Sequence, residues 1–385
     1  MKKTYAVLGG GGSFGLHTSK YLLDHADPAK VIAVGRNLPK DECFTLGIGD
    51  GDPRYSYHAY HVNYELDLLM EVLDRAKPQV IINFAAQGEG ATSLKHSWRY
   101  FETNCVALVK LTEQLQSRDY LERFIQIGTS ELYGSVEHAA KEDEPIKPTS
   151  PYAASKAAFD MHLMSVHRFL KFPMNIIRPS NAYGPGQQLH RVIPKTVICG
   201  LTGRKLPLHG GGHAEKSYIH NRDLARAIHM VSEKAPLGTV YNAGSKEPTS
   251  IRRVVELVAE ALKMPFEQLC EVTGDRQHQD SRYWLDSSAI KRDVGWEPQI
   301  SWQEGMGEMV EWGRKYLPQL KTLPTDFVMR ACWLRVRCAR VQSFRCFSRF
   351  PHHAAACPCG GRAVATVGWP LPHAASRFQS GYLLS

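Results

Sequence analysis

A tyrosine and a lysine stand four residues apart in the segment 150–156, Ser-Pro-Tyr-Ala-Ala-Ser-Lys. Ser150 followed by Pro151 is typical of a helix N-cap and first helical residue, so the segment is predicted to begin a helix. Tyr152 and Lys156 then lie one turn apart on the same helix face. An ammonium beside a phenol favours the phenolate and lowers the tyrosine pKa, which suits acid–base chemistry. The same spacing also occurs in helices that only pack, so the pair alone does not establish catalysis.

Three polar residues, Thr129, Ser130 and Glu131, follow an apolar run that begins at Phe124 and ends at Gly128. Such a run is typical of a buried strand, and ligands of open α/β sheets bind at the carboxyl ends of the strands. Thr129 can donate a hydrogen bond to a substrate oxygen, and Glu131 can act as a base or an acid. A strand that ends in a polar turn would have a similar sequence. The tyrosine helix follows after one loop, which favours a catalytic site.

A glycine-rich turn follows the apolar run 4–8 and precedes a helical pattern. Gly9, Gly12 and Gly15 give the spacing G-x-x-G-x-x-G, with Ser13 and Phe14 at the start of the helix. Glycines allow a tight turn and let the backbone approach a pyrophosphate at the helix N-terminus. The flanking strand and helix distinguish such a turn from a flexible loop. The sequence therefore predicts a dinucleotide site.

Short apolar strands alternate with helices through the first half of the chain, which indicates a doubly wound parallel sheet. The second strand, 30–35, continues into Arg36 with no acid before Asp41. In dinucleotide folds an acid at this place binds the ribose diol, whereas an arginine suits a 2′-phosphate. The pattern favours NADP as the cofactor, with NAD as the alternative.

The composition is that of an ordinary globular protein, with 385 residues, of which 43% are hydrophobic and 22% charged. The net charge of +9 comes mainly from 327–385, which hold eight of the 47 basic residues and no acid. The other 39 basic residues nearly balance the 38 acidic ones, so nucleic-acid binding by the fold is not predicted. No signal peptide and no run long enough to span a membrane are found, and we expect a cytoplasmic enzyme.

Four motifs, in this order, make the chain resemble the extended short-chain dehydrogenase/reductases, in the branch of nucleotide-sugar epimerases and dehydratases. They are G-x-x-G-x-x-G at 9–15, Thr-Ser-Glu-Leu-Tyr-Gly at 129–134, Ser-Pro-Tyr-Ala-Ala-Ser-Lys at 150–156 and Arg-Pro-Ser-Asn-Ala-Tyr-Gly-Pro-Gly at 178–186. The resemblance extends from residue 1 to about 320. It implies a Rossmann-type domain at 1–178 and a smaller, mainly substrate-binding α/β domain at 179–323 that returns to the sheet. The basic tail 324–385 matches nothing in the family, and we expect it to be disordered.

The resemblance also implies further ligand contacts. Ala85 and Ala86, at the end of the fourth strand, would lie beneath the cofactor, and Lys156 would also hold the ribose hydroxyls. The substrate would be bound by residues at family positions near the sugar and the nucleotide diphosphate, namely Gln87, Asn181, Lys216, Asn242, Arg276 and Tyr283. Two departures weaken the match: a lysine stands at 216 where an arginine is usual, and Gln-His-Gln replaces Pro-Gly-His after Arg276.

The reaction implied by the resemblance begins with oxidation at C4 of the sugar, for which Tyr152 is the base and Thr129 binds O4. A 4,6-dehydratase must also remove the C5 proton and expel the C6 hydroxyl. Glu131 is expected to be that base, and Ser130 stands where several dehydratases have an aspartic acid. We predict a nucleotide-hexose 4,6-dehydratase. A 4-epimerase, a UDP-glucuronate decarboxylase and a non-catalytic NADP-binding scaffold are the alternatives, and neither the nucleotide nor the hexose is determined.

Two further expectations concern assembly and metals. The helices that contain Asn104 and Tyr152 are expected, by resemblance, to form a homodimer interface. Five of the nine cysteines lie in the tail, but Cys357-Pro-Cys359 without a second cysteine pair is a poor zinc frame. The acids Asp50 and Asp52 lie in a Gly/Pro turn. We therefore predict no metal site.

Overall fold

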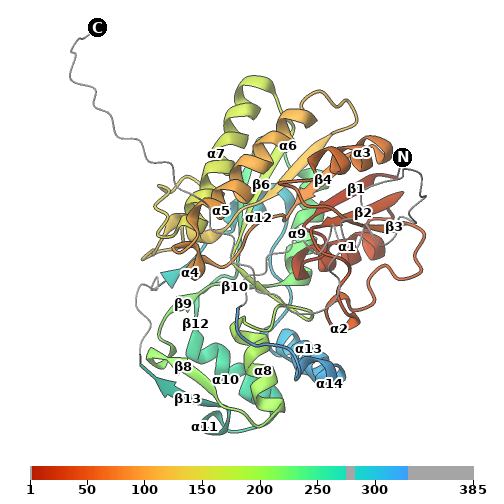
Figure 1. Ribbon diagram of the computed structural model, residues 1–385. Coiled ribbons are helices and arrows are strands. Elements are labelled where there is room, and N and C mark those ends of the chain that lie inside the picture. The colour runs from red at the N-terminus through yellow and green to blue at the C-terminus, as the bar shows by residue number, and fades with distance from the viewer. Residues whose placement is uncertain (1, 275–281, 328–385) are drawn as a thin grey trace, which may run out of the picture. The chain divides into compact units, whose positions relative to one another are not determined.

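The central sheet has seven strands, all parallel, in the order β11-β6-β5-β4-β1-β2-β3 (Figure 1). The computed structural model describes residues 2–274 and 282–327, which belong to one compact unit. The strands are β1 (Thr4–Leu8), β2 (Lys30–Gly35), β3 (Tyr55–Ala59), β4 (Val80–Asn83), β5 (Arg123–Ile127), β6 (Met174–Pro179) and β11 (Val240–Ala243). The predicted doubly wound sheet is confirmed, and its strand order reverses between β1 and β4, where such sheets bind ligands.

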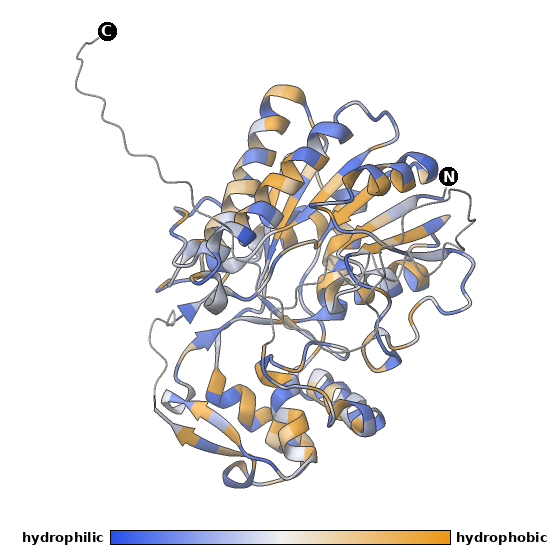
Figure 2. Ribbon diagram, viewed as in Figure 1, coloured by the Kyte–Doolittle hydropathy of each residue, from blue (hydrophilic) through white to orange (hydrophobic). Residues whose placement is uncertain are grey.

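Helices cover both faces of this sheet. Those on one face are α1 (Ser13–His25), α9 (Asn221–Lys234) and α12 (Ser288–Val294), and those on the other are α3 (Leu66–Ala76), α6 (Ala107–Leu115) and α7 (Pro151–Leu170). Successive strand residues point to opposite faces, so Val7 joins the first core while Ala6 and Leu8 join the second. The strands other than the edge strand β3 are mostly buried on both faces and are therefore largely orange in the hydropathy view (Figure 2).

Several short elements lie in the loops of this half of the chain. They are α2 (Glu42–Thr45), α4 (Gly90–Ser93), α5 (Ser97–Phe101), the π-helical turn η1 (Glu102–Val106) and the 3₁₀ turn η2 (Ser130–Tyr133). Together α5, η1 and α6 make the predicted helix around Asn104. The π-helical turn inside it was not predicted.

The chain after β6 builds a second core of its own. It lies among α8 (Val192–Leu201), α10 (Ile251–Leu262), α13 (Trp302–Lys315) and α14 (Leu317–Leu320), with the strand pair β8 (Leu206–His209) and β13 (Cys270–Thr273). Further short elements are β7 (Asn181–Tyr183), β9 (Glu215–Lys216), β10 (Tyr218–His220), β12 (Thr249–Ser250), β14 (Arg282–Tyr283), η3 (Gly210–Gly212) and α11 (Phe266–Leu269). The same half returns α9, β11 and α12 to the central sheet.

The predicted boundary between the two domains does not fall in a loop. The boundary at 178/179 falls inside β6, so the division into a dinucleotide domain and a substrate domain stays a prediction. The predicted disorder of the tail concerns residues that, after Phe327, lie outside the described part of the chain. Within residues 2–274 and 282–327, no helix has the length and apolar character to cross a membrane.

Candidate active site

A cavity of about 1770 Å³ lies at the carboxyl ends of β1, β2, β4 and β5. Its walls contain the glycine-rich turn, the Thr-Ser-Glu segment and the start of α7, so the fold brings all three motifs together. Every predicted cofactor-binding and catalytic residue lines it: Gly9, Gly12, Ser13, Phe14, Gly15, Arg36, Ala85, Ala86, Thr129, Ser130, Glu131, Tyr152 and Lys156.

The glycine-rich turn has the geometry that a dinucleotide cradle needs. Gly9 has a φ of +77°, and a Cβ there would lie 2.7 Å from the carbonyl carbon of Phe84. A Cβ on Gly15 would lie 2.7 Å from the Cα of Gly10, so only glycine lets α1 approach the turn this closely. The first turn of α1 carries no acidic residue, which leaves its backbone N–H groups available to an anion. These residues fit the pyrophosphate of a dinucleotide.

The start of α7 fixes the positions of the tyrosine and the lysine. The Ser150 hydroxyl accepts a hydrogen bond from the backbone N–H of Ala153 at 3.1 Å, and Pro151 is the first helical residue, as predicted. The Lys156 ammonium is buried and donates to the carbonyl oxygen of Ile127, at the end of β5. This bond ties α7 to the strand that leads into the Thr-Ser-Glu segment.

The electrostatics of this pair differ from the prediction. Burial and the Glu131 carboxylate raise the pKa of Tyr152 above its ordinary value, although a hydrogen bond with Thr129 opposes them. Burial also lowers the pKa of Lys156 to about 8, against the effect of Asp160. The predicted lowering of the Tyr152 pKa by Lys156 is therefore wrong for this arrangement. The helical spacing was predicted correctly, but burial disfavours the charged phenolate and is the largest cause of the raised Tyr152 pKa.

The Glu131 carboxylate and the Tyr152 ring border one part of the cavity. A Cβ on Gly90, the first residue of α4, would lie 3.2 Å from Oε2 of Glu131 and 3.9 Å from Cδ1 of Tyr152. The backbone N–H of Glu131 donates to the Thr129 hydroxyl at 3.2 Å, which begins η2. Two groups able to move protons, a phenol and a carboxylate, therefore stand beside the same space.

The predicted substrate residues divide into two groups. Gln87, Asn181 and Lys216 line the cavity, whereas Asn242 and Tyr283 do not. The buried Asn242 side chain accepts a hydrogen bond from the Tyr133 hydroxyl at 3.0 Å and donates to the carbonyl oxygen of Ala140 at 2.9 Å.

Neither residue lines the described part of the cavity, so their substrate contacts stay predictions. Asn242 holds the chain around η2 in place, and Tyr283 packs beneath Lys216, whose ammonium lies 5.3 Å from the ring centre. Arg276 and the Gln-His-Gln that follows it lie outside the described residues.

A charged cluster that was not predicted from the sequence lines the cavity. Glu89, after β4, has a φ of +79°, and its carboxylate lies 3.3 Å from Nε2 of His190 and 3.7 Å from the guanidinium of Arg191. His190, together with the Arg191 charge, lowers the pKa of Glu89 in spite of its burial. These residues are about a hundred positions apart in irregular segments, so no local pattern could have revealed their contact.

The segment 323–327 was also missed as part of the cavity wall. Asp326 accepts a hydrogen bond from the Lys195 ammonium at 2.8 Å, and the Phe327 ring packs edge-on against His190, with 5.0 Å between the ring centres. The sequence analysis placed residues 324–327 in the tail.

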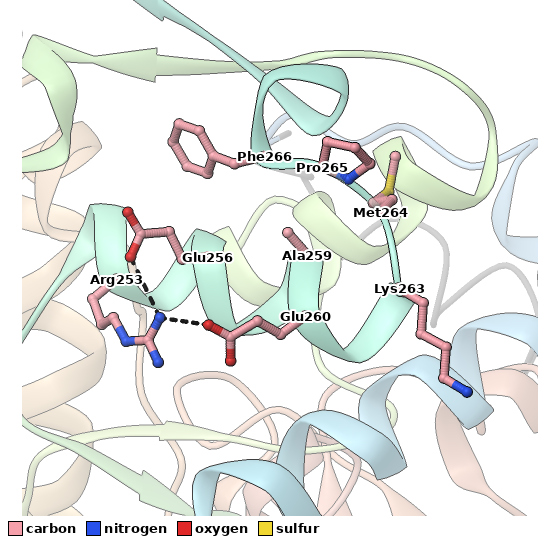
Figure 3. Close-up of a pocket in the computed structure, with 8 residues that line it drawn as sticks. All are labelled: Arg253, Glu256, Ala259, Glu260, Lys263, Met264, Pro265 and Phe266. Atoms are coloured by element: carbon pink, nitrogen blue, oxygen red, sulfur yellow. Dashed lines mark hydrogen bonds and ion pairs between the residues drawn. The ribbon is translucent and has the colours of Figure 1, made fainter.

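A second, shallower depression of about 460 Å³ lies on the outer side of α10 (Figure 3). It contains none of the predicted residues, and Arg253 is occupied there by ion pairs with Glu256 and Glu260 (Figure 3). In the part of the chain that the structure describes, no set of three histidine, cysteine or acidic side chains could hold a metal ion.

Comparison with known proteins places the chain among enzymes that act on nucleotide sugars. A family model described as GDP-mannose 4,6-dehydratase matches residues 7–309. The Low-salt glycan biosynthesis protein Agl12 of Haloferax volcanii is 32% identical over 311 residues, which cover 80% of this chain and 97% of that protein. A trifunctional UDP-glucose 4,6-dehydratase/UDP-4-keto-6-deoxy-D-glucose 3,5-epimerase/UDP-4-keto-L-rhamnose-reductase of Arabidopsis thaliana is 27% identical over 80% of this chain. The chain spans about half of that protein's length, 47%.

Solved structures have the same fold. The dTDP-glucose 4,6-dehydratase of Bacillus anthracis, solved in complex with NAD, has a TM-score of 0.75 and 30% identity, covering 84% of this chain and all of that one. The UDP-glucose 4-epimerase of Thermotoga maritima, solved with UDP-glucose, has a TM-score of 0.74 and 25% identity, covering 82% of this chain and 99% of that one.

Proposed function

Because this chain belongs to the GDP-mannose 4,6-dehydratase family, we propose that it is a nucleotide-sugar 4,6-dehydratase. The observation that carries the proposal is the position of Glu131 beside Tyr152 at one wall of the cavity. Oxidation at C4 needs one base, but loss of water across C5 and C6 needs a second one. Tyr152 and Glu131, which both line the cavity, are the two groups that we assign to these roles.

The side chains divide the proton transfers between them. Tyr152 removes the proton from the C4 hydroxyl, while Thr129 binds the same oxygen and the buried Lys156 lies one helical turn from Tyr152. A nicotinamide dinucleotide, which the glycine-rich turn and Lys156 would hold, would supply the hydride chemistry that C4 and C6 require. The resulting 4-keto group acidifies the C5 hydrogen, which Glu131 removes as a proton and passes to the C6 hydroxyl, so that this group departs as water. When the hydride reaches C6, C5 takes up one proton from solvent, and Tyr152 releases to solvent the proton that it took from O4. The product is a 4-keto-6-deoxy sugar, one water lighter than the substrate.

A 4-epimerase is the second candidate, and the structural similarity to the Thermotoga maritima enzyme favours it. Epimerisation needs Tyr152, Lys156 and Thr129 but no base at C5. A role for Glu131 is therefore what separates the two candidates. No observation favours a decarboxylase or a non-catalytic scaffold.

The proposal is tested by mass spectrometry of the purified protein with GDP-mannose, UDP-, dTDP- and CDP-glucose and UDP-glucuronate, without added cofactor. We expect one of the hexose substrates to lose one water, which also identifies the nucleotide and the hexose. Loss of carbon dioxide from the glucuronate would indicate the decarboxylase instead. An isomer of unchanged mass, separated by chromatography, would indicate the epimerase.

We further propose that the dinucleotide is NADP. The cavity continues past the end of β2, where Arg36, Asn37 and Lys40 line it and no acid stands before Asp41. The Tyr57 hydroxyl donates to the carbonyl oxygen of Asn37 at 2.7 Å, which holds this loop close to the glycine-rich turn. An arginine here suits a 2′-phosphate, as argued from the sequence.

Replacement of this arginine, Arg36→Asp, tests the cofactor preference. We expect the Kd for NADP⁺ to rise about 100-fold, because a bidentate donor becomes a repelling charge, while NAD⁺ binds at least as well as before. Isothermal titration calorimetry measures both affinities. The control Arg75→Asp makes the same charge change on an exposed residue outside the cavity. An equal rise in the Kd for NADP⁺ and for NAD⁺ would show that Arg36 does not bind the 2′-phosphate.

We propose a homodimer formed through α5, η1 and α7, which lie together on one side of the molecule. Several large apolar side chains of these elements are exposed, namely Trp98, Phe101, Val106, Met161 and Met164. A soluble monomer rarely leaves such a patch uncovered. A second copy of the same helices is the partner that the family resemblance implies.

The substitution Met161→Glu is expected to weaken this dimer about 10- to 100-fold, because a carboxylate would have to be buried in an apolar interface. Sedimentation velocity over a range of concentrations measures the monomer fraction. Val272→Glu is the control, since Val272 is similarly exposed and lies on β13, which pairs with β8. A dimer of unchanged stability would locate the interface elsewhere.

The cytoplasm is our proposed location for the enzyme. The four cysteines among the described residues, Cys43, Cys105, Cys199 and Cys270, are free thiols. Free, scattered cysteines suit a reducing compartment.

A further inference from the structure

Helix α1 presents a polar face to the second half of the chain. Ser13 and His17 lie one turn apart on this face and are both buried. Nε2 of His17 lies 2.8 Å from the carbonyl oxygen of Pro185. Ser13 contacts Asn221 at the start of α9. In the ribbon view, α1 and α9 lie side by side on one face of the sheet (Figure 1).

The contact between Ser13 and Asn221 has a defined direction. Nδ2 of Asn221 donates to Oγ of Ser13 at 3.0 Å, and the two residues are only 1% and 3% exposed. An amide nitrogen can only donate, so it occupies a lone pair of the hydroxyl oxygen. The hydroxyl proton of Ser13 must therefore point to another acceptor. Ser13 lines the cavity at the first position of α1, where the glycine-rich turn would receive a pyrophosphate.

Holding the Asn221 amide in this orientation costs folding free energy. Among the described residues its Oδ1 has no hydrogen-bond partner, although the atom is buried. A buried polar atom without a partner costs about 1–3 kcal/mol, which suggests a functional reason for keeping the amide. The surroundings also leave it little freedom, since a Cβ on Gly184 would lie 2.9 Å from Nδ2.

We propose that Asn221 is a positioning residue that directs the hydroxyl proton of Ser13 toward the pyrophosphate of the bound dinucleotide. Ser13 contacts the ligand, and Asn221 acts only through Ser13. The inference rests on the dinucleotide binding proposed above. It adds that the second half of the chain takes part in this binding, through a residue that directly follows β10.

A double-mutant cycle tests this arrangement. The variants are Ser13→Ala, Asn221→Leu and the two combined, and the ligands are ADP-ribose, which has the pyrophosphate, and adenosine, which lacks it. We expect Ser13→Ala to raise the Kd for ADP-ribose about 10-fold, because one hydrogen bond to a charged group is lost. Asn221→Leu alone should raise the Kd for ADP-ribose about 3- to 10-fold. It should have no effect on this Kd when residue 13 is alanine. Adenosine affinity should not change in any variant.

Three checks separate this role from a structural one. Ser19→Ala removes another buried hydroxyl of α1 and should leave both affinities unchanged. Asn221→Ser, whose hydroxyl is too short to reach Ser13, replaces Asn221→Leu if the latter does not fold, and thermal melting reports folding in every case. Independent, multiplicative losses for Ser13→Ala and Asn221→Leu would overturn the proposal, and so would an equal loss of adenosine affinity. A wild-type protein that binds no dinucleotide and no ADP-ribose would overturn the proposed function as well.

Discussion

Glu131→Gln is expected to stop the loss of water while C4 oxidation continues. Glutamine keeps the size of the side chain and its hydrogen bonds but cannot accept the C5 proton. A positioned base contributes about 10²- to 10⁴-fold, so dehydration should slow by that factor. In single-turnover experiments the trapped sugar should be two hydrogens lighter than the substrate, which is the mass of the 4-keto hexose. Mass spectrometry of quenched reactions distinguishes it from the dehydrated product.

The matched control for this variant is Glu137→Gln, which makes the same change on an exposed residue outside the cavity. Exchange of the C5 hydrogen in deuterated water gives an independent measurement. It should disappear with Glu131→Gln and persist with the control. A normal yield of dehydrated product from Glu131→Gln would exclude Glu131 as the C5 base and would leave the epimerase as the better candidate.

Tyr152→Phe is expected to stop the reaction one step earlier. Phenylalanine keeps the ring, which packs edge-on against Tyr100 with 6.4 Å between the centres, but it removes the hydroxyl. Without that group the C4 hydroxyl has no base, and we expect C4 oxidation to fall about 10²- to 10⁴-fold. Neither the 4-keto hexose nor the dehydrated sugar should then accumulate. Transfer of a deuterium label from C4 to C6 of the product is the measurement.

The control Tyr64→Phe removes an exposed hydroxyl that donates to Glu102, outside the cavity, and it should leave label transfer unchanged. Dinucleotide affinity checks that Tyr152→Phe still forms its binding site. If the label still reached C6 at the normal rate in Tyr152→Phe, another group would have to deprotonate the C4 hydroxyl. The two variants together order the proton transfers: one should trap the oxidised sugar, and the other should prevent its formation.

The elements that carry the chemistry could be predicted because their signals are local. The turn at Gly9 and Gly15 needs residues without a side chain, and the start of α7 needs a cap such as Ser150. Parallel strands buried on both faces are apolar throughout, so β1, β2 and β5 stood out from the sequence. Once these elements are in a doubly wound sheet, the carboxyl ends of the strands meet at one edge. The motifs had to meet there.

What could not be predicted depends on burial and on contacts between distant segments. The spacing of Tyr152 and Lys156 predicts that they are neighbours on one helix, but it does not reveal that burial raises the Tyr152 pKa. Asn242 matches a family position, but this match does not reveal that its side-chain oxygen accepts a hydrogen bond from the Tyr133 hydroxyl. Glu89 meets His190 only because the loop after β4 faces the start of α8. No periodicity in the sequence predicts such a contact.

The wall segment 323–327 has a consequence for anyone who shortens or tags this protein. The predicted boundary at 323/324 runs through it, so a chain cut there would lose Asp326, which pairs with Lys195, and Phe327, which packs on His190. A fusion partner attached at that cut would begin at the rim of the substrate cavity. Expression vectors for kinetic work should therefore keep the sequence through Phe327 and place any tag at the other end of the chain.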